Sequence, residues 1–201
     1  MDTLLKLITL AGIFVNHKAQ AAEYYKDIWG TSVRVNTSGF SNNENRTINR
    51  ALTFISNRLE EMYTSDRSNY WDCAKRYDNY SFDSSYPKYE NIVYATGEVL
   101  GRLNDGINIS AYYDRNASHW GKARRTSRGI SIKLNRAKLQ SHTSSASWGA
   151  LIFHEALHNV GLKHSSNARP SSTPMSQIYK MQGCFKGRSG FSLAGAQPSC
   201  G

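Results

Sequence analysis

Two histidines and the glutamate between them are the residues of this chain best suited to chemistry. His154 and His158 stand four positions apart, and Glu155 directly follows the first of them. On an α-helix, side chains at positions i and i+4 project from one face, one turn apart. Two imidazole nitrogens arranged in this way can reach a single metal ion at roughly 2.0–2.1 Å each. Because a neighbouring carboxylate can take a proton from water held at such an ion, the spacing predicts a hydrolytic zinc site.

The residues that follow the second histidine extend this motif. Gly161 can adopt a positive φ, so it is expected to end the helix and to turn the chain back. His164 comes three residues later and is the candidate for a third ligand. Three protein ligands leave a fourth coordination position open, which is typical of catalytic zinc sites. His119 and His142 lie outside the motif and are expected to be ordinary surface or capping histidines.

Over residues 154–175 the chain resembles the metzincin superfamily of zinc endopeptidases. The pattern of that superfamily is H-E-x-x-H-x-x-G-x-x-H, followed by a turn that contains a methionine. The resemblance implies that Met175, in the sequence Ser-Thr-Pro-Met-Ser, lies beneath the zinc as an apolar floor and not as a ligand. Met181 is the alternative methionine downstream. Ser165, directly after the third histidine, resembles the residue that matrix metalloproteinases carry there, although the subfamily stays open.

The resemblance also implies the reaction, which is hydrolysis of peptide bonds with Glu155 as general base and one catalytic Zn²⁺ as cofactor. Astacin-like and serralysin-like enzymes carry a tyrosine two residues after the methionine, whereas Gln177 stands at that position here. Tyr179 comes two residues later still, and packing is its expected role. Zinc would then carry most of the negative charge on the reacting carbonyl oxygen.

The fold class expected from the resemblance is α+β. It implies a metzincin-like zincin fold, in which a twisted, mixed, five-stranded sheet packs on a backing helix and an active-site helix. The catalytic domain would occupy residues 22–201. Its N-terminal subdomain, 22–164, would contain the zinc helix, and a small C-terminal subdomain, 165–201, would contain the methionine turn.

Local patterns indicate individual elements of such a fold. Ser41 and Glu44 form a capping box that opens a helix. An apolar stripe follows at steps of four and three and ends near Tyr63; its members are Ile48, Leu52, Ile55, Leu59 and Met62. Alternating apolar residues predict strands at 32–36, 107–111 and 130–134, with a further candidate at 92–95. The histidine-bearing helix is expected to start within 143–147, and a short helix is expected near 176–185.

A basic stretch lies between the last two predicted strands. In metzincins the corresponding segment is the sheet edge at which an extended substrate pairs, so the resemblance implies that these cations flank bound substrate. The hypothesis that follows is a preference for acidic residues near the cleaved bond. The alternative is that the charges protect an edge strand from aggregation. The residues concerned are Lys122, Arg124, Arg125 and Arg128.

Residues 1–21 have the pattern of a secretory signal peptide. Lys6 precedes an apolar run over residues 7–15, and residues 19–21 fit an A-x-A cleavage site. The run is too short to cross a bilayer, and a buried N-terminal helix is the alternative interpretation. The sequence therefore predicts a secreted protein, extracellular or periplasmic, without a membrane span.

The cysteines and the aromatic-rich stretch 64–91 leave alternatives open. The chain has three cysteines, so an oxidising compartment allows one disulfide; Cys184–Cys200 is the favoured pair, and Cys73 is the alternative partner for either. The stretch 64–91 is interpreted as an insertion packed by its own aromatic side chains. A substrate-binding loop or a calcium loop is the alternative, but the spacing of a calcium loop is absent.

The net charge of +10 at pH 7 favours anionic surroundings and acidic protein or peptide substrates. No recognisable nucleic-acid-binding module is present, and a monomer is expected. Two alternatives to a general endopeptidase remain. One is a metallopeptidase restricted to cell-wall peptides or to one partner protein, and the other is a non-catalytic secreted binding protein that contains zinc.

Overall fold

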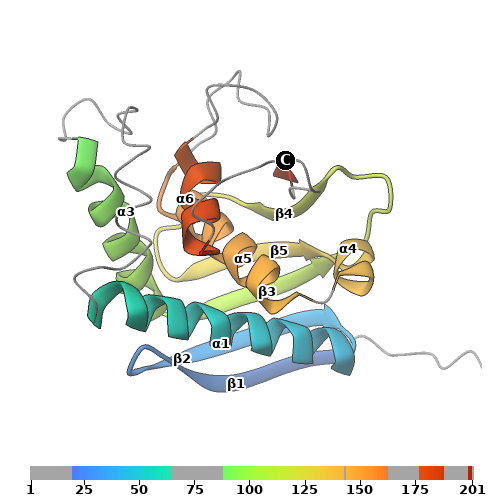
Figure 1. The fold of residues 1–201 in the computed structure, drawn as a ribbon. Coiled ribbons are helices and arrows are strands. Elements are labelled where there is room, and N and C mark those ends of the chain that lie inside the picture. The colour runs from blue at the N-terminus through green and yellow to red at the C-terminus, as the bar shows by residue number, and fades with distance from the viewer. Residues whose placement is uncertain (1–19, 65–87, 143, 163–176, 188–198, 201) are drawn as a thin grey trace, which may run out of the picture.

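The computed structural model describes residues 20–64, 88–142, 144–162, 177–187 and 199–200. Residues 1–19 of the predicted signal peptide, the third histidine His164, the methionine Met175 and most of the aromatic-rich stretch lie outside these residues. The last two residues of the predicted signal peptide, Gln20 and Ala21, belong to the first strand, Gln20–Ile28. The signal peptide, His164 and Met175 therefore stay predictions. The described part of the chain contains the histidine-bearing helix and the sheet that supports it (Figure 1).

A mixed sheet of six strands forms the centre of the described fold (Figure 1). Its spatial order is β1-β2-β3-β5-β4-β6. Strands β2, β3 and β5 run parallel to one another. Strand β1 pairs antiparallel with β2, and β4 pairs antiparallel with β5. Strand β6 pairs parallel with β4. The strands are β1 (Gln20–Ile28), β2 (Thr31–Phe40), β3 (Ile107–Tyr112), β4 (His119–Ala123), β5 (Ile130–Asn135) and the two-residue β6 (Ser199–Cys200). The predicted α+β class with a mixed sheet is confirmed, with β6 as an additional short strand.

Helices α1 and α5 pack on the same face of this sheet and against each other (Figure 1). Alternate residues of the strands point into this layer and are fully buried, among them Val35, Ile109 and Ile132. The apolar faces of the two helices complete the core. The described helices are α1 (Asn42–Thr64), α3 (Lys88–Leu103), α4 (Arg136–Ser141), α5 (Ser145–Asn159) and α6 (Gln177–Phe185).

Helix α1 forms as its sequence predicts. The Ser41 N–H donates to Glu44 Oε2 at 2.6 Å, and the Glu44 N–H donates to Ser41 Oγ at 3.4 Å, which is the reciprocal pattern of a capping box. The predicted apolar stripe faces the core, and each of its members is at most 5% exposed. The predicted cap and stripe are therefore confirmed.

Two parts of the secondary structure differ from the prediction. The candidate strand at 92–95 is wrong, because these residues belong to helix α3. Ala95, Val99 and Leu103 are buried at steps of four, and this helical spacing places them together on the core side. A short apolar run fits a strand and a buried helix equally well, so the run alone does not show which of the two forms. Strand β1 was not predicted, because its sequence lacks a clear alternation of apolar and polar residues. Lys26, for example, takes a position on the side of α1, where its Nζ donates to Thr53 Oγ1.

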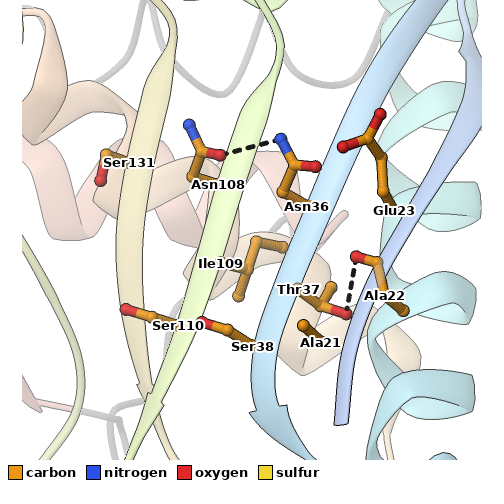
Figure 2. A pocket seen from close by; sticks show the side chains of 10 residues that line it. All are labelled: Ala21, Ala22, Glu23, Asn36, Thr37, Ser38, Asn108, Ile109, Ser110 and Ser131. Atoms are coloured by element: carbon orange, nitrogen blue, oxygen red, sulfur yellow. Dashed lines mark hydrogen bonds between the residues drawn. The ribbon is translucent and has the colours of Figure 1, made fainter.

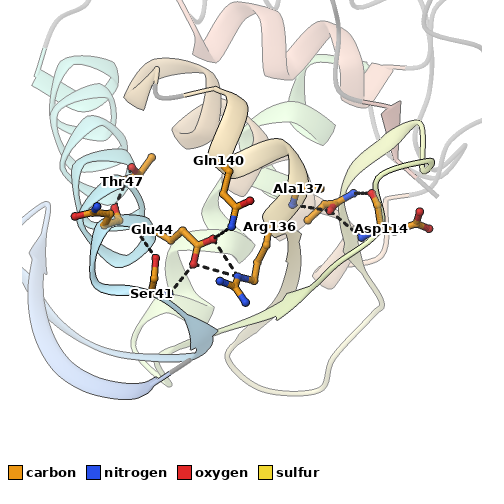
Figure 3. Close-up of polar contacts among 9 residues, drawn as sticks. Ser41, Glu44, Thr47, Asp114, Arg136, Ala137 and Gln140 are labelled. Atoms are coloured by element: carbon orange, nitrogen blue, oxygen red, sulfur yellow. Dashed lines mark hydrogen bonds and ion pairs between the residues drawn. The ribbon is translucent and has the colours of Figure 1, made fainter. Parts of the chain in front are cut away.

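The first turn of α1 is fastened to α4 through the carboxylate of Glu44 (Figure 3). Arg136 Nε donates to both Glu44 oxygens at 3.0 and 3.1 Å, and Gln140 Nε2 donates to Oε1 at 2.9 Å. Burial raises the pKa of Glu44, but the hydrogen bonds from Arg136, Ser41 and Gln140 together outweigh it, so the pKa is lowered from its ordinary value of 4.5.

Replacing Glu44 with alanine is expected to lower the free energy of unfolding by about 2–3 kcal/mol at pH 7, because Arg136 and Gln140 lose their shared acceptor. Since the pKa of Glu44 is lower in the folded chain, its contribution is present above pH 4.5 and is lost as the pH falls through the folded-state pKa. Urea unfolding at several pH values checks this. A difference from wild type that stays constant into acid would contradict it, and Glu60→Ala on the exposed side of α1 is the matched control.

Candidate metal and catalytic site

Helix α5 carries the candidate site through the middle of the core. Ser144 caps it, with its Oγ accepting from the Ser147 N–H at 3.3 Å, so the helix starts within the predicted run. Every residue from Trp148 to Leu157 is buried. A helix that is buried on all sides belongs to the centre of a domain, as the sequence predicted.

His154 and His158 project from the same side of α5, as their spacing predicts. Their ring centroids lie 5.0 Å apart, with the ring planes at 72°. His154 and Glu155 are both 0% exposed, whereas His158 is partly exposed. The described structure therefore brings together two imidazoles and one carboxylate of the predicted site.

The turn after α5 fixes the orientation of His158. Gly161 has a φ of +107°, and the Leu162 N–H bonds back to the Leu157 carbonyl at 3.1 Å, which is the bond that closes a Schellman-type helix end. This turn brings the Leu162 carbonyl to 2.7 Å from His158 Nδ1. A carbonyl oxygen only accepts hydrogen bonds, so His158 Nδ1 carries the hydrogen and Nε2 keeps its lone pair.

The protonation of His158 suits a metal ligand. Burial lowers the pKa of His158, and the hydrogen bond to the Leu162 carbonyl acts in the opposite direction without reversing the effect. The imidazole is therefore neutral at neutral pH, which is the form that binds metal ions. A carbonyl held against the other ring nitrogen is the usual second partner of a metal-binding histidine.

Strand β4 runs directly against the carboxyl group of Glu155. A Cβ atom added at Gly121 would lie 2.5 Å from Glu155 Oε1 and 2.9 Å from its Cδ, so only glycine fits here without displacing the carboxylate. Gly121 was not among the residues predicted for the site. A glycine inside a strand often marks a close approach of another group, and that was the available signal.

Asn159 ties the last turn of α5 to its surroundings and was also missed. Its side chain is 0% exposed, donates to the Glu155 carbonyl at 2.8 Å and accepts from the Ser131 N–H at 2.7 Å. Its own carbonyl accepts from Arg102 Nη1 at 2.9 Å and from the Thr126 N–H at 3.1 Å. The helix turn that bears His158 is thus held to β5, to α3 and to the loop before β5.

Helix α6 covers the first histidine. The Tyr179 ring is 2% exposed, and its centroid lies 5.0 Å from that of His154. This agrees with the expected packing role of Tyr179. Met181, the alternative to Met175, is 2% exposed and packs in the hydrophobic core.

The basic residues proposed to flank substrate lie on β4 and in the segment that follows it. Lys122 follows Gly121 on β4, and neighbouring residues of a strand point to opposite faces of the sheet. Because Gly121 faces Glu155, the side chain of Lys122 points away from Glu155. Its Nζ lies 5.0 Å from the centroid of the Tyr112 ring. The three arginines are exposed and follow β4 in the chain: Arg124, Arg125 and Arg128. Arg125 borders the turn after α5, with its Cδ 3.7 Å from a Cβ built at Gly161.

A separate pocket of about 340 Å³ lies on the outer face of the sheet (Figure 2). Glu23, Asn36, Asn108 and Ser131 form a row across four strands, in which Asn36 Nδ2 donates to Asn108 Oδ1 at 3.0 Å. Asn108 and Ser131 alternate with core-facing isoleucines, so this row faces away from α5. The pocket is therefore separate from the histidines.

Comparison of the chain with known protein families, with curated proteins and with solved structures finds no match. Within residues 20–64, 88–142, 144–162, 177–187 and 199–200, no group of three or more His, Cys, Asp or Glu side chains is arranged to hold a metal ion. The assignment to the metzincin superfamily is therefore wrong. It rested on a short motif, and the described residues supply only two of the three histidines of that motif.

None of the helices in the described part of the chain has the length and apolar character needed to cross a membrane. This agrees with the expected absence of a membrane span. The remaining predictions about partners and localisation stay predictions.

Cys184, on α6, is disulfide-bonded and 2% exposed. Its partner's side chain lies outside the described part of the structure. We expect the partner to be Cys200, because that bridge would fasten the C-terminal segment to α6. Peptide mapping of the unreduced protein by mass spectrometry checks this expectation, and a Cys73–Cys184 peptide would show it to be wrong.

Proposed function

We propose that the protein is a secreted zinc-dependent endopeptidase. The observation that carries this proposal is the arrangement on α5, where two histidines share one side of a buried helix and a glutamate adjoins the first. His158 adds weight, since its Nδ1–H is engaged by the Leu162 carbonyl at 2.7 Å, the kind of second partner that metal-binding histidines usually have.

The donor set fits zinc. Neutral imidazoles are common zinc ligands, and the two rings, with centroids 5.0 Å apart, are spaced for a shared ion. His154 and His158 would hold the ion, and His164 is proposed as the third ligand. When bound at such a site, Zn²⁺ polarises a carbonyl group and lowers the pKa of water from 15.7 to about 7.

Glu155 supplies the proton transfers. Its carboxylate takes a proton from water as the water attacks the carbonyl carbon of the peptide bond. The same group then delivers the proton to the amine that leaves. Complete burial and contact with β4 hold the carboxylate in one place, so little reorganisation is needed when the reaction begins.

Asn159 is proposed as a positioning residue for this site. Its side chain joins the Glu155 carbonyl to the Ser131 N–H, and its carbonyl accepts from Arg102. These bonds restrain the turn of α5 between Glu155 and His158. A displacement of 1 Å at a catalytic group can cost about 10²-fold in rate, so a buried restraint of this kind supports catalysis.

Hydrolysis of casein by the purified zinc-loaded protein tests the proposal, with cell-wall fragments assayed alongside. Cleavage of casein supports a general endopeptidase. Cleavage of cell-wall fragments alone would favour the narrowly specific metallopeptidase. If zinc binds and neither substrate is cut, the proposal fails in favour of the non-catalytic binding protein.

A further inference from the structure

Two rows of polar side chains cross the outer face of the sheet, which lies opposite α1 and α5 (Figure 2). The first, called the asparagine row, lines the pocket on this face and consists of Glu23, Asn36, Asn108 and Ser131. The second, called the lysine row, crosses β2, β3, β5 and β4 in direct register and consists of Ser38, Ser110, Lys133 and Lys122. Neighbouring strands lie about 4.8 Å apart, so each row of four residues spans about 14 Å.

The lysine row places two positive charges directly opposite each other. Lys122 and Lys133 are partners in the antiparallel pairing of β4 with β5, an arrangement of like charges that destabilises a sheet. Within the described residues, neither lysine forms an ion pair with an acidic side chain; the Nζ of Lys122 instead lies over the Tyr112 ring, which holds the charge in place without neutralising it. Lys133 also pairs with Ser110, which lines the pocket, so both charges border the pocket and are suited to receive an anionic group.

The asparagine row offers hydrogen-bond donors and acceptors side by side. Asn36 Nδ2 donates to Asn108 Oδ1 at 3.0 Å. This bond leaves Asn36 Oδ1 as an acceptor and Asn108 Nδ2 as a donor, each without a partner among the described residues. Glu23 adds a carboxylate at the β1 end of the row, and Ser131 adds a hydroxyl at the β5 end. The row therefore suits a ligand whose own groups both donate and accept hydrogen bonds.

We propose that the outer face of the sheet binds an acidic polysaccharide, with its hydroxyl groups on the asparagine row and its carboxylate or sulfate groups on the two lysines. Sugar hydroxyls both donate and accept, so they match amides, serine hydroxyls and the Glu23 carboxylate. An extended peptide adds to a sheet through the backbone groups of an edge strand, which a face does not offer. Single-stranded nucleic acids stack on aromatic side chains, and the two rows contain none. This inference goes beyond the proposed endopeptidase function and does not rest on it, because the face points away from α5.

Four probes distinguish the ligand classes in calorimetric titrations at physiological salt concentration. Heparin oligosaccharides carry sulfates, oligogalacturonate carries carboxylates, dextran is an uncharged sugar chain, and a single-stranded DNA oligonucleotide is a polyanion without sugar hydroxyls of the same density. We expect at least one of the two acidic sugars to bind, and the tighter of the two shows which acidic group the lysines receive. Dextran is expected not to bind, and DNA is expected to bind at least about tenfold more weakly than the preferred sugar, because it lacks the hydroxyls that the asparagine row would hold.

Three double variants locate the binding on this face. Lys122→Gln with Lys133→Gln removes the paired charges, and Asn36→Ala with Asn108→Ala removes the amides without changing the net charge. Each is expected to weaken binding of the acidic sugar by about tenfold or more, the effect of losing two hydrogen bonds or two charged contacts. Arg46→Gln with Arg50→Gln, on the exposed side of α1, removes the same charge as the lysine variant and is the matched control, expected to leave the affinity within about twofold.

The results that would overturn the proposal are distinct. Equal weakening by the arginine and lysine variants would show that only the net charge of +10 attracts the sugar. Full affinity in the asparagine variant would show that the pocket takes no part, and DNA binding as tight as that of the sugars would show a general attraction of polyanions. Failure of both acidic sugars to bind would also overturn it. None of the substituted side chains is buried, so each variant is expected to fold, and thermal melting of the same samples checks this.

Discussion

Replacing Glu155 with alanine is expected to lower the rate of casein hydrolysis by about 10²–10⁴-fold while the zinc content stays at the wild-type value. The carboxylate is the only part of the proposed site that moves protons, whereas the histidines that would hold the metal are unchanged. Rates measured under substrate saturation, together with zinc content by atomic absorption, check both parts of the expectation. Glu60→Ala, on the exposed side of α1, controls for loss of a carboxylate elsewhere.

Two results would count against this role of Glu155. A zinc-replete Glu155→Ala protein with wild-type activity would show that another group acts as the base. Loss of zinc together with activity would show that the glutamate is a ligand. The burial of Glu155, which is 0% exposed, makes a stability measurement necessary as well, because alanine leaves a cavity in the core.

Gly121→Ala is expected to reduce kcat by about 10²-fold, because the new methyl group would lie 2.5 Å from Glu155 Oε1 and must displace the carboxylate. The colliding atoms belong to the end of a side chain, so the fold can absorb the change, with an expected loss of stability of about 1–2 kcal/mol. The predicted signature is therefore a large kinetic effect with a small change in melting temperature. Steady-state kinetics and thermal unfolding of the same samples measure it.

Gly97→Ala is the matched control for this substitution. A Cβ at Gly97, in helix α3, meets nothing within 4 Å. Alanine there is expected to leave kcat unchanged and to stabilise the chain by about 0.4–1 kcal/mol. If Gly121→Ala keeps full kcat while folding normally, the position of Glu155 against β4 is not important for hydrolysis.

Local features of the fold were predictable from the sequence because they depend on residues a few positions apart. The capping box of Ser41 and Glu44 and the positive φ of Gly161 follow from the residues themselves. The cap of α5 falls within the predicted Ser/Thr-rich run for the same reason. The facing histidines follow from the helical repeat, since i and i+4 share a side.

Features that depend on distant parts of the chain were missed. Gly121 matters because β4 passes Glu155, and Asn159 matters because it meets the Ser131 N–H, 28 positions away. A single sequence does not say which strand passes which helix. The strand predicted at 92–95 was wrong for a related reason. The apolar run itself does not distinguish a strand from a helix, whereas the burial of Val99 and Leu103 on the core side of α3 is known only from the fold.

The family assignment failed because it extended a local motif to the whole chain. The motif does predict the local geometry of α5, where both histidines and the turn at Gly161 are as expected. The motif says nothing about the other residues, and the comparison with protein families finds no match for the chain. The proposed chemistry therefore stands on the contacts of His154, Glu155 and His158 alone.

The central claim is that hydrolysis depends on one zinc ion held by His154 and His158. The most direct test adds zinc stepwise to the metal-free protein while casein hydrolysis is followed. We expect no hydrolysis without metal and a rate of hydrolysis that rises with added zinc and levels off at one zinc per chain. Full hydrolysis by the metal-free protein, or a protein that takes up no zinc, would contradict it.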